Sequence, residues 1–137
     1  MQKLRGTNKI KRGWAFYYKR IDREFSVLVR EKGYCEWCGS VDNQLQHAHV
    51  IGRANKFLRW DIMNAMCLCS YCHQYRWHEN PLIAQKWFKE KFPGRYIYLM
   101  EARGRTVDRF EEDYLRIRSD IKNKNIKNLI MAPDLLT

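Results

Sequence analysis

Hydrophobic residues recur at intervals of three and four positions in two long stretches of the chain, the spacing of one face of an α-helix. The first stretch, residues 17–32, has Ile21, Phe25, Leu28 and Val29 as its apolar positions and ends at a glycine typical of a helix C-terminus, Gly33. The second, residues 108–122, has Phe110, Tyr114, Leu115, Ile117 and Ile121 as its apolar positions. Asp108 and Glu111 are candidates for a capping box at its start. Both patterns predict amphipathic helices.

Between these helices the apolar pattern is shorter and is bounded by turn residues. Residues 45–51 alternate loosely and predict a short strand, and a partner strand is expected near residues 63–68. Asn80 and Pro81 are typical of a helix start, and this third helix should stop at Pro93. Its apolar face is expected to carry Ile83, Trp87 and Phe88. Helices and strands in this mixture predict an α+β fold, with the tail after residue 122 unassigned.

The length of the chain, 137 residues, corresponds to one domain. We expect a basic N-terminal arm and helix in residues 1–32, a core in residues 33–92, and a helical extension in residues 93–137 that packs on the same domain. No apolar run approaches the ~20 residues of a membrane-spanning helix, and the basic start lacks the apolar stretch of a secretory signal. A cytoplasmic protein without a membrane partner is therefore expected.

The net charge of +11 is unevenly distributed. Residues 1–34 carry ten Lys/Arg against three Asp/Glu, residues 35–80 carry four against four, and residues 81–137 carry twelve against eight. Basic segments on both sides of a neutral centre favour a polyanionic partner, and nucleic acid is the leading candidate. The alternative is that the Lys and Arg side chains only solvate exposed helix faces.

Four of the five cysteines form two C-x-x-C pairs. Such pairs place two thiolates on one side of a tight turn, and two of them complete a tetrahedron around zinc. We therefore predict a structural zinc site made by Cys35, Cys38, Cys69 and Cys72. The fifth cysteine, Cys67, should point to the opposite face of an extended segment and pack in the core, with replacement of Cys69 as the alternative.

All four histidines lie between residues 47 and 78, among these cysteines. His49 is followed fifteen residues later by Asn64, and Asn64 nine residues later by His73. With the two C-x-x-C pairs, this order and spacing resemble the HNH nuclease motif. The stretch HAHVIGRA, with FLRWDIMNAMCLCSYCH and HENPL after it, is more narrowly similar to the NinG/Rap group of phage recombination endonucleases over residues 33–92.

The resemblance implies a ββα-metal core, in which a β-hairpin and a helix hold one catalytic Mg²⁺ or Mn²⁺. It implies an endonuclease that hydrolyses DNA phosphodiester bonds to 5′-phosphate and 3′-hydroxyl ends, and branched recombination intermediates as its substrate. His49 would be the general base, which suits imidazole with its usual pKa of about 6.5. Asn64 would tie the hairpin loop beside this base, and His73 would be a metal ligand.

One departure from the family concerns the remaining metal ligands. Most HNH enzymes have Asp or His directly before the base, where this chain has Ala48. His47 is the nearest replacement, because positions 47 and 49 of a strand face the same side. His78 is a further candidate ligand, although it follows His73 by five residues and one helical turn favours four. For both, a structural histidine is the alternative.

Two arginines and an aromatic segment are candidates for contact with DNA. Arg53 and Arg59 lie in the expected hairpin connection, where they could pair with phosphate oxygens, or be surface arginines without a role. The segment WAFYYKR, residues 14–20, mixes aromatic and basic residues as single-strand stacking surfaces do, although a helical core stripe is the favoured interpretation.

Three function classes follow from these observations. The one we favour is a metal-dependent HNH endonuclease. The second is a zinc-knuckle module that binds nucleic acid without catalysis, which the alanine at position 48 leaves open. The third is a zinc-stabilised adaptor whose basic flanks meet an acidic protein. No heptad or other interface pattern indicates a homodimer.

Overall fold

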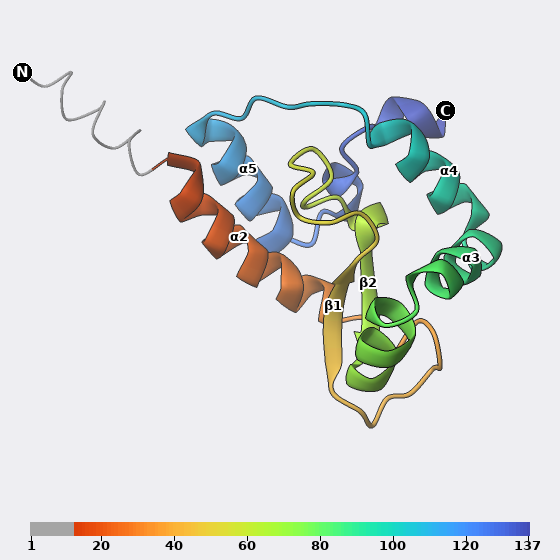
Figure 1. Cartoon of the computed structure of the whole chain (residues 1–137). Helices are drawn as coiled ribbons and strands as arrows, with labels where there is room; N and C mark the ends of the chain where they lie inside the picture. Colours follow the sequence, from red (N-terminus) through yellow and green to blue (C-terminus); the bar gives the residue numbers. More distant parts are fainter. Residues whose placement is uncertain (1–12) are drawn as a thin grey trace, which may run out of the picture.

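The computed structural model describes residues 13–137, and the predicted basic arm lies outside this range. A two-stranded antiparallel sheet lies among helices, so the α+β class is confirmed. Helices α2 and α5 pack together beside the sheet, and α3 and α4 lie on the other side of it (Figure 1). The elements are α2 (Gly13–Arg30), β1 (Leu45–His49), η1 (Ile62–Asn64), β2 (Ala65–Cys69), η2 (Cys72–His78), α3 (Pro81–Lys91), α4 (Pro93–Ala102), α5 (Glu111–Lys122), η3 (Ile126–Leu129) and η4 (Pro133–Leu136).

The hairpin β1–β2 is the centre of the fold. Leu45 pairs with Cys69 at one end and His49 with Ala65 at the other. The first strand ends two residues earlier than predicted, because the backbone of Val50 and Ile51 turns aside to bond to Asn64. All five residues of β2 are buried. A strand covered on both faces needs helices on each side, and the flanking helices supply them.

The long helix α2 packs on α5 through one apolar stripe. Ile21, Phe25 and Val29 are buried, as the helical spacing predicted. Gly33 follows the helix with a φ of +83°, a left-handed conformation that glycine adopts without strain. Glu24 and Arg118 join the two helices by an ion pair with a nitrogen–oxygen distance of 2.8 Å.

The N-terminus of α5 differs from the prediction in its cap. The carboxylate of Asp113 accepts the backbone N–H of Phe110 at 2.8 Å, so Asp108 and Glu111 do not form the cap. Phe110 and Leu115 are 69 % and 49 % exposed, and only Tyr114, Ile117 and Ile121 of the predicted stripe are buried. The stripe is therefore narrower than predicted: Phe110 precedes the helix, and Leu115 lies within it beside the buried face.

Helix α4 was not predicted, since Pro93 was interpreted only as the end of α3. The backbone N–H at the first position of a helix has no partner within the helix, and proline has no such N–H to leave unpaired. The residue that stops α3 therefore also starts α4. Tyr98, Leu99 and Ala102 of α4 are buried. On α3 the buried residues are Ala84 and Phe88, whereas Ile83 is 62 % exposed and was wrongly placed on the apolar face.

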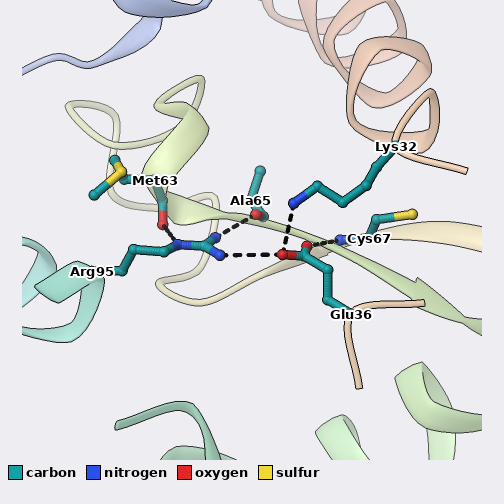
Figure 2. Close-up of polar contacts among 6 residues, drawn as sticks. All are labelled: Lys32, Glu36, Met63, Ala65, Cys67 and Arg95. Carbon is teal, nitrogen blue, oxygen red and sulfur yellow. Dashed lines mark hydrogen bonds and ion pairs between the residues drawn. The ribbon is translucent and has the colours of Figure 1, made fainter. Parts of the chain in front are cut away.

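The outer edge of β2 is covered by two charged side chains (Figure 2). Glu36 accepts the backbone N–H of Cys67 at 2.8 Å, and its own N–H donates to the Cys67 carbonyl at 2.8 Å. Arg95 of α4 donates to the carbonyls of Met63 at 3.2 Å and Ala65 at 2.7 Å. Arg95 also contacts Glu36 at 3.3 Å, which links α4, the first C-x-x-C turn and the sheet.

The unassigned tail is anchored to the core through Asp61, which is fully buried. Its carboxylate accepts the hydroxyl of Tyr98 and the backbone N–H of Met63 and Met131. Burial raises the pKa of this carboxyl group. Within residues 13–137, no helix combines the length and the apolar character that crossing a membrane requires.

Candidate metal centre and histidine cavity

The four cysteines of the two C-x-x-C pairs form one cluster. Their sulfur atoms all lie within 4.8 Å of one another, and the Sγ atoms of Cys38 and Cys69 are 3.8 Å apart. Ligands about 2.3 Å from a tetrahedral zinc ion are about 3.8 Å apart, so the cluster has the dimensions of a zinc site. Cys67 is fully buried in the core that contains Phe25 and does not belong to the cluster, as predicted.

Local backbone structure holds the thiols of the cluster in place. Gly39, with a φ of +77°, closes the first turn, and the N–H of Cys72 donates to Cys69 Sγ at 3.4 Å in the second. Burial alone would raise the pKa of Cys35, but backbone hydrogen bonds around the turns lower it to about 7. The thiolate is the form that binds zinc, and the backbone donors favour it at Cys35, whereas burial and the neighbouring thiols raise the pKa of Cys72.

The four histidines line a second site, here called the histidine cavity, which also includes Asp22, Arg23, Ser26, Gly52 and Arg53. His47 and His49 lie on one face of β1, with ring centroids 4.2 Å apart. His73 and His78 come from η2. The hairpin and the helix that follows it thus bring together all the histidines of the chain.

The helix η2 explains how His73 and His78 meet although five residues separate them. It is a π-helix, in which hydrogen bonds join residues five apart, as between the N–H of Glu79 and the carbonyl of Gln74 at 3.1 Å. The two Nε2 atoms are 2.9 Å apart. The α-helical spacing used in the sequence analysis was wrong here, since the wider turn aligns positions i and i+5.

The orientation of these two rings fits a shared cation. Gln46 Oε1 lies 2.8 Å from His73 Nδ1, so the tautomer with its proton on Nδ1 donates to Gln46 and directs the Nε2 lone pair towards His78 Nε2. Without a cation, these two Nε2 atoms are within hydrogen-bond distance of each other. Two nitrogens about 2.1 Å from one ion and 2.9 Å apart subtend nearly a right angle. That is the angle between neighbouring ligands of an octahedral cation such as Mg²⁺ or Mn²⁺.

The histidines of β1 are held as neutral imidazoles. Burial lowers the pKa of His47 to about 3, with the nearby His49 adding to the effect. Burial and, to a smaller extent, the positive charge of Arg53 together lower the pKa of His49 to about 4. Among the described residues, His47 Nε2 is a buried polar atom without a hydrogen-bond partner. Both rings are therefore neutral near pH 7, and His47 Nε2 keeps a lone pair that no described residue occupies.

Asn64 fixes the loop that follows His49. Its side-chain oxygen accepts the N–H of Ile51 at 2.7 Å, and its amide nitrogen donates to the carbonyls of Ile51 at 2.9 Å and Leu58 at 3.1 Å. From the other side, Trp77 Nε1 donates to the His49 carbonyl at 3.1 Å. Asn64 does not line the histidine cavity, so it acts by holding the strand end that carries His49.

Ala48 lies on the opposite face of β1 from His47 and His49. It is fully buried in the core cluster that contains Met66 and Leu58. A ligand at position 48 would have to point into this apolar core. The departure from the HNH pattern at this position is therefore consistent with the pleat of the strand, which sends positions 47 and 49 to the cavity.

Asp22 is a cavity residue that the sequence analysis missed. It accepts two hydrogen bonds from Arg59, at 3.0 and 2.6 Å, and one from Trp60 Nε1 at 2.8 Å. Although burial would raise it, these bonds hold the pKa of Asp22 below its usual range. The polar position of Asp22 in an amphipathic helix was the available signal, but the partners that orient it come from residues 37 and 38 positions away.

The two candidate arginines differ in availability. Arg59 is paired with Asp22, donates to the Arg53 carbonyl at 3.0 Å, and has only 15 % of its side chain exposed. Arg53 has 62 % exposed and approaches Asp22 only to 3.9 Å. Arg59 is thus committed to contacts within the protein, and Arg53 is the one open to a ligand in the cavity.

No family model, no curated protein and no solved structure matches the chain.

Proposed function

We propose that the protein is a metal-dependent endonuclease of the HNH type that hydrolyses DNA phosphodiester bonds. The observation that carries the proposal is the pair of Nε2 atoms 2.9 Å apart on η2, in the same cavity as His47 and His49. One group of nitrogens can hold a cation while a separate imidazole accepts a proton. Hydrolysis of a phosphodiester requires both functions.

In this proposal His49 is the general base. With a pKa of about 4 it is neutral near pH 7 and has a lone pair available, but it is a weak base. A cation that acidifies the attacking water would let this ring take the proton. Asn64 and Trp77 are positioning residues, because they fix the backbone on both sides of His49. The ring therefore meets the substrate in one orientation.

His73 and His78 would hold the cation through their two Nε2 atoms, with water completing its coordination. Among the described residues only the cysteine cluster brings three or more such ligand atoms within 4.8 Å of one another, so His47 would join this shell only after a shift of its ring. A bound Mg²⁺ or Mn²⁺ would supply a positive charge that stabilises the developing negative charge on phosphate. Gln46 orients His73 as an outer-shell partner. Arg53, exposed at the rim, would bind a phosphate oxygen beside the bond that is cut.

Zinc in the cysteine cluster would have a separate, structural role. Cys72 and His73 are neighbours, so the metal that fixes Cys72 also fixes the start of η2. The products are proposed to be 5′-phosphate and 3′-hydroxyl ends. Branched recombination intermediates are proposed as the substrate on the basis of the family resemblance, and the host cytoplasm as the location.

The test is cleavage of supercoiled plasmid and of a four-way junction by the purified protein with Mg²⁺, Mn²⁺ or no divalent ion added. We expect metal-dependent cutting that is lost in His49→Ala while zinc content, measured by elemental analysis, stays the same. Preference for the junction would support the recombination substrate. If the wild-type protein binds DNA but does not cut it with any metal, the chain is a non-catalytic zinc-knuckle module.

A further inference from the structure

A second cavity continues from the histidine cavity along the N-terminal half of α2. It is lined by Trp14, Lys19 and Lys56 among others, and it shares Asp22 and Arg53 with the histidine cavity. Because of the shared residues, the two cavities are neighbours on the surface between α2 and the hairpin loop. We call the part that reaches from Asp22 to Trp14 the α2 groove.

The α2 groove carries positive charge. Lys19 and Lys56 line it, Arg53 lies at the junction with the histidine cavity, and Arg23 lies just inside that cavity. The acidic group among them, Asp22, is already neutralised by Arg59. Arg53 approaches Asp22 only to 3.9 Å, and no ion pair of Lys19, Lys56 or Arg23 is found among the described residues. These charges suit a chain of phosphates.

Trp14 gives the groove an aromatic surface that the core does not explain. Tyr17 and Tyr18 of the same segment are buried, whereas Trp14 is 59 % exposed. The edge-on ring of Tyr18 supports the indole at 5.4 Å, and the ammonium group of Lys56 lies 5.3 Å from its centre. Because the ammonium group lies over the ring face, a base that stacks there would displace it, and Lys56 could then bind the phosphate of the same nucleotide.

We infer that the α2 groove binds an unpaired strand of DNA next to the bond that is cut, with one base stacked on Trp14. The inference rests on the proposed function, since it places this strand relative to the histidine cavity. Only an unpaired base offers its face for stacking on a protein side chain. The substrate would therefore be DNA with a single-stranded segment beside the cleavage site.

The groove also sets the length of that segment. Trp14 and Ser26, which lines the histidine cavity, are 12 residues apart on α2. At about 1.5 Å per residue this is about 18 Å along the helix axis. At the spacing of about 3.4 Å per nucleotide of a strand in duplex DNA, about five nucleotides span the groove, and a more extended unpaired strand needs fewer.

The first experiment measures binding without cleavage, by fluorescence anisotropy with no Mg²⁺ or Mn²⁺ added. The probes are a labelled 12-nucleotide single strand and the blunt duplex of the same sequence. Trp14→Ala should weaken single-strand binding by about tenfold and duplex binding much less, because stacking is lost. Trp14→Phe should restore part of the affinity, which excludes misfolding as the cause.

Two further variants act as controls. Tyr34→Ala removes an aromatic ring that is 46 % exposed but lines neither cavity, and it should leave binding unchanged. Lys56→Ala should reduce the slope of log affinity against log salt by about 0.7, the value for one lost contact with a single strand. Lys86→Ala, exposed on α3, should not change the slope as much.

The outcomes separate this inference from the proposed function. If Trp14→Ala binds the single strand as tightly as wild type, the groove assignment is overturned, whether or not the protein cuts DNA. If Trp14→Ala loses single-strand affinity but wild type cuts no DNA with any metal, the groove stands and the nuclease proposal falls. Cleavage beside a five-nucleotide single-stranded segment, weakened in Trp14→Ala, would support both.

Discussion

Cys72 and His73 are neighbours in the chain, yet their side chains belong to two sites of different construction. The cysteine cluster has three of its four thiols buried and uses only cysteine side chains. The histidine cavity is open, and arginine, serine and aspartate line it beside the imidazoles. A closed tetrahedral set suits a metal that stabilises the fold, whereas an open site leaves positions for water and substrate.

The largest expected effect on stability comes from a change in the cysteine cluster. Cys69→Ser should lose zinc and destabilise the protein by more than about 4 kcal/mol, because the metal joins the first turn to the end of β2. Elemental analysis and thermal unfolding measure the two changes. Cys67→Ala is the matched control, since this cysteine is outside the cluster and its variant should keep zinc. Full zinc content in Cys69→Ser would contradict the assignment.

Removing a ligand from the histidine cavity should reduce cleavage and leave zinc content and stability almost unchanged. His78→Ala should reduce Mg²⁺-dependent cleavage by about a hundredfold while zinc content and melting temperature change little. Gln46→Ala, which removes only the partner of His73, should cost about tenfold. Cleavage rates of the variants over a Mg²⁺ titration measure both effects. Undiminished cleavage in His78→Ala would remove it from the proposed metal site.

Arg59 and Arg53 should differ in their effects, since the contacts of Arg59 stabilise the fold and Arg53 is open to bind DNA. Arg59→Ala should lower the free energy of unfolding by about 2 kcal/mol, because it leaves the partly buried Asp22 without its main partner. Arg53→Ala should change stability by less than about 0.5 kcal/mol but weaken DNA binding. Denaturant unfolding and anisotropy titrations separate the two. Equal destabilisation by both variants would contradict the difference in their contacts.

A different contrast between buried and exposed groups is the dependence of stability on pH. The folded-state pKa values of His47 and His49, about 3 and about 4, lie below the usual value, so the unfolded chain binds more protons in weak acid. Stability should therefore fall as the pH drops from about 6.5 towards these values, by up to about 1.4 kcal/mol per pH unit for each histidine. Denaturant unfolding at several pH values measures the slope.

His47→Gln provides the comparison for that slope. Glutamine does not titrate, so the free energy of unfolding of the variant should fall less steeply between pH 6 and pH 4.5. The difference in slope should be the contribution of one histidine, up to about 1.4 kcal/mol per pH unit. Protonation of the zinc thiolates affects both proteins equally and cancels in the difference. Identical slopes for the two proteins would mean that His47 is not a buried neutral imidazole in the folded state.

The elements predicted from local patterns are present in the structure, because their signals lie within a few residues. Helix α2, the hairpin and the two C-x-x-C turns each depend on spacing along a short segment. Pro93 shows the limit of such signals, since the same proline that ends α3 begins α4. Whether the chain turns into a loop or a new helix there depends on tertiary packing by residues such as Tyr98.

The candidate site was predictable in its residue types but not in its contacts. The histidines stood out by their clustering, whereas the π-helical turn that joins His73 to His78 has no pattern that distinguishes it from an α-helical one. The difference between Arg53 and Arg59 likewise depends on Asp22, which is distant in sequence. Catalytic roles of His49 and Asn64 and the binding of DNA remain predictions.

The covered edge of β2 has a consequence for self-association. An exposed strand edge with free N–H and C=O groups can pair with a strand of another molecule and start aggregation. Here the groups of Cys67 are bonded to Glu36, which directly follows the zinc-cluster residue Cys35. Loss of zinc would free Glu36 along with its turn and uncover this edge. A metal held by the four cysteines would therefore protect the protein against intermolecular β-pairing, so that chelation should yield aggregates as well as unfolded chains.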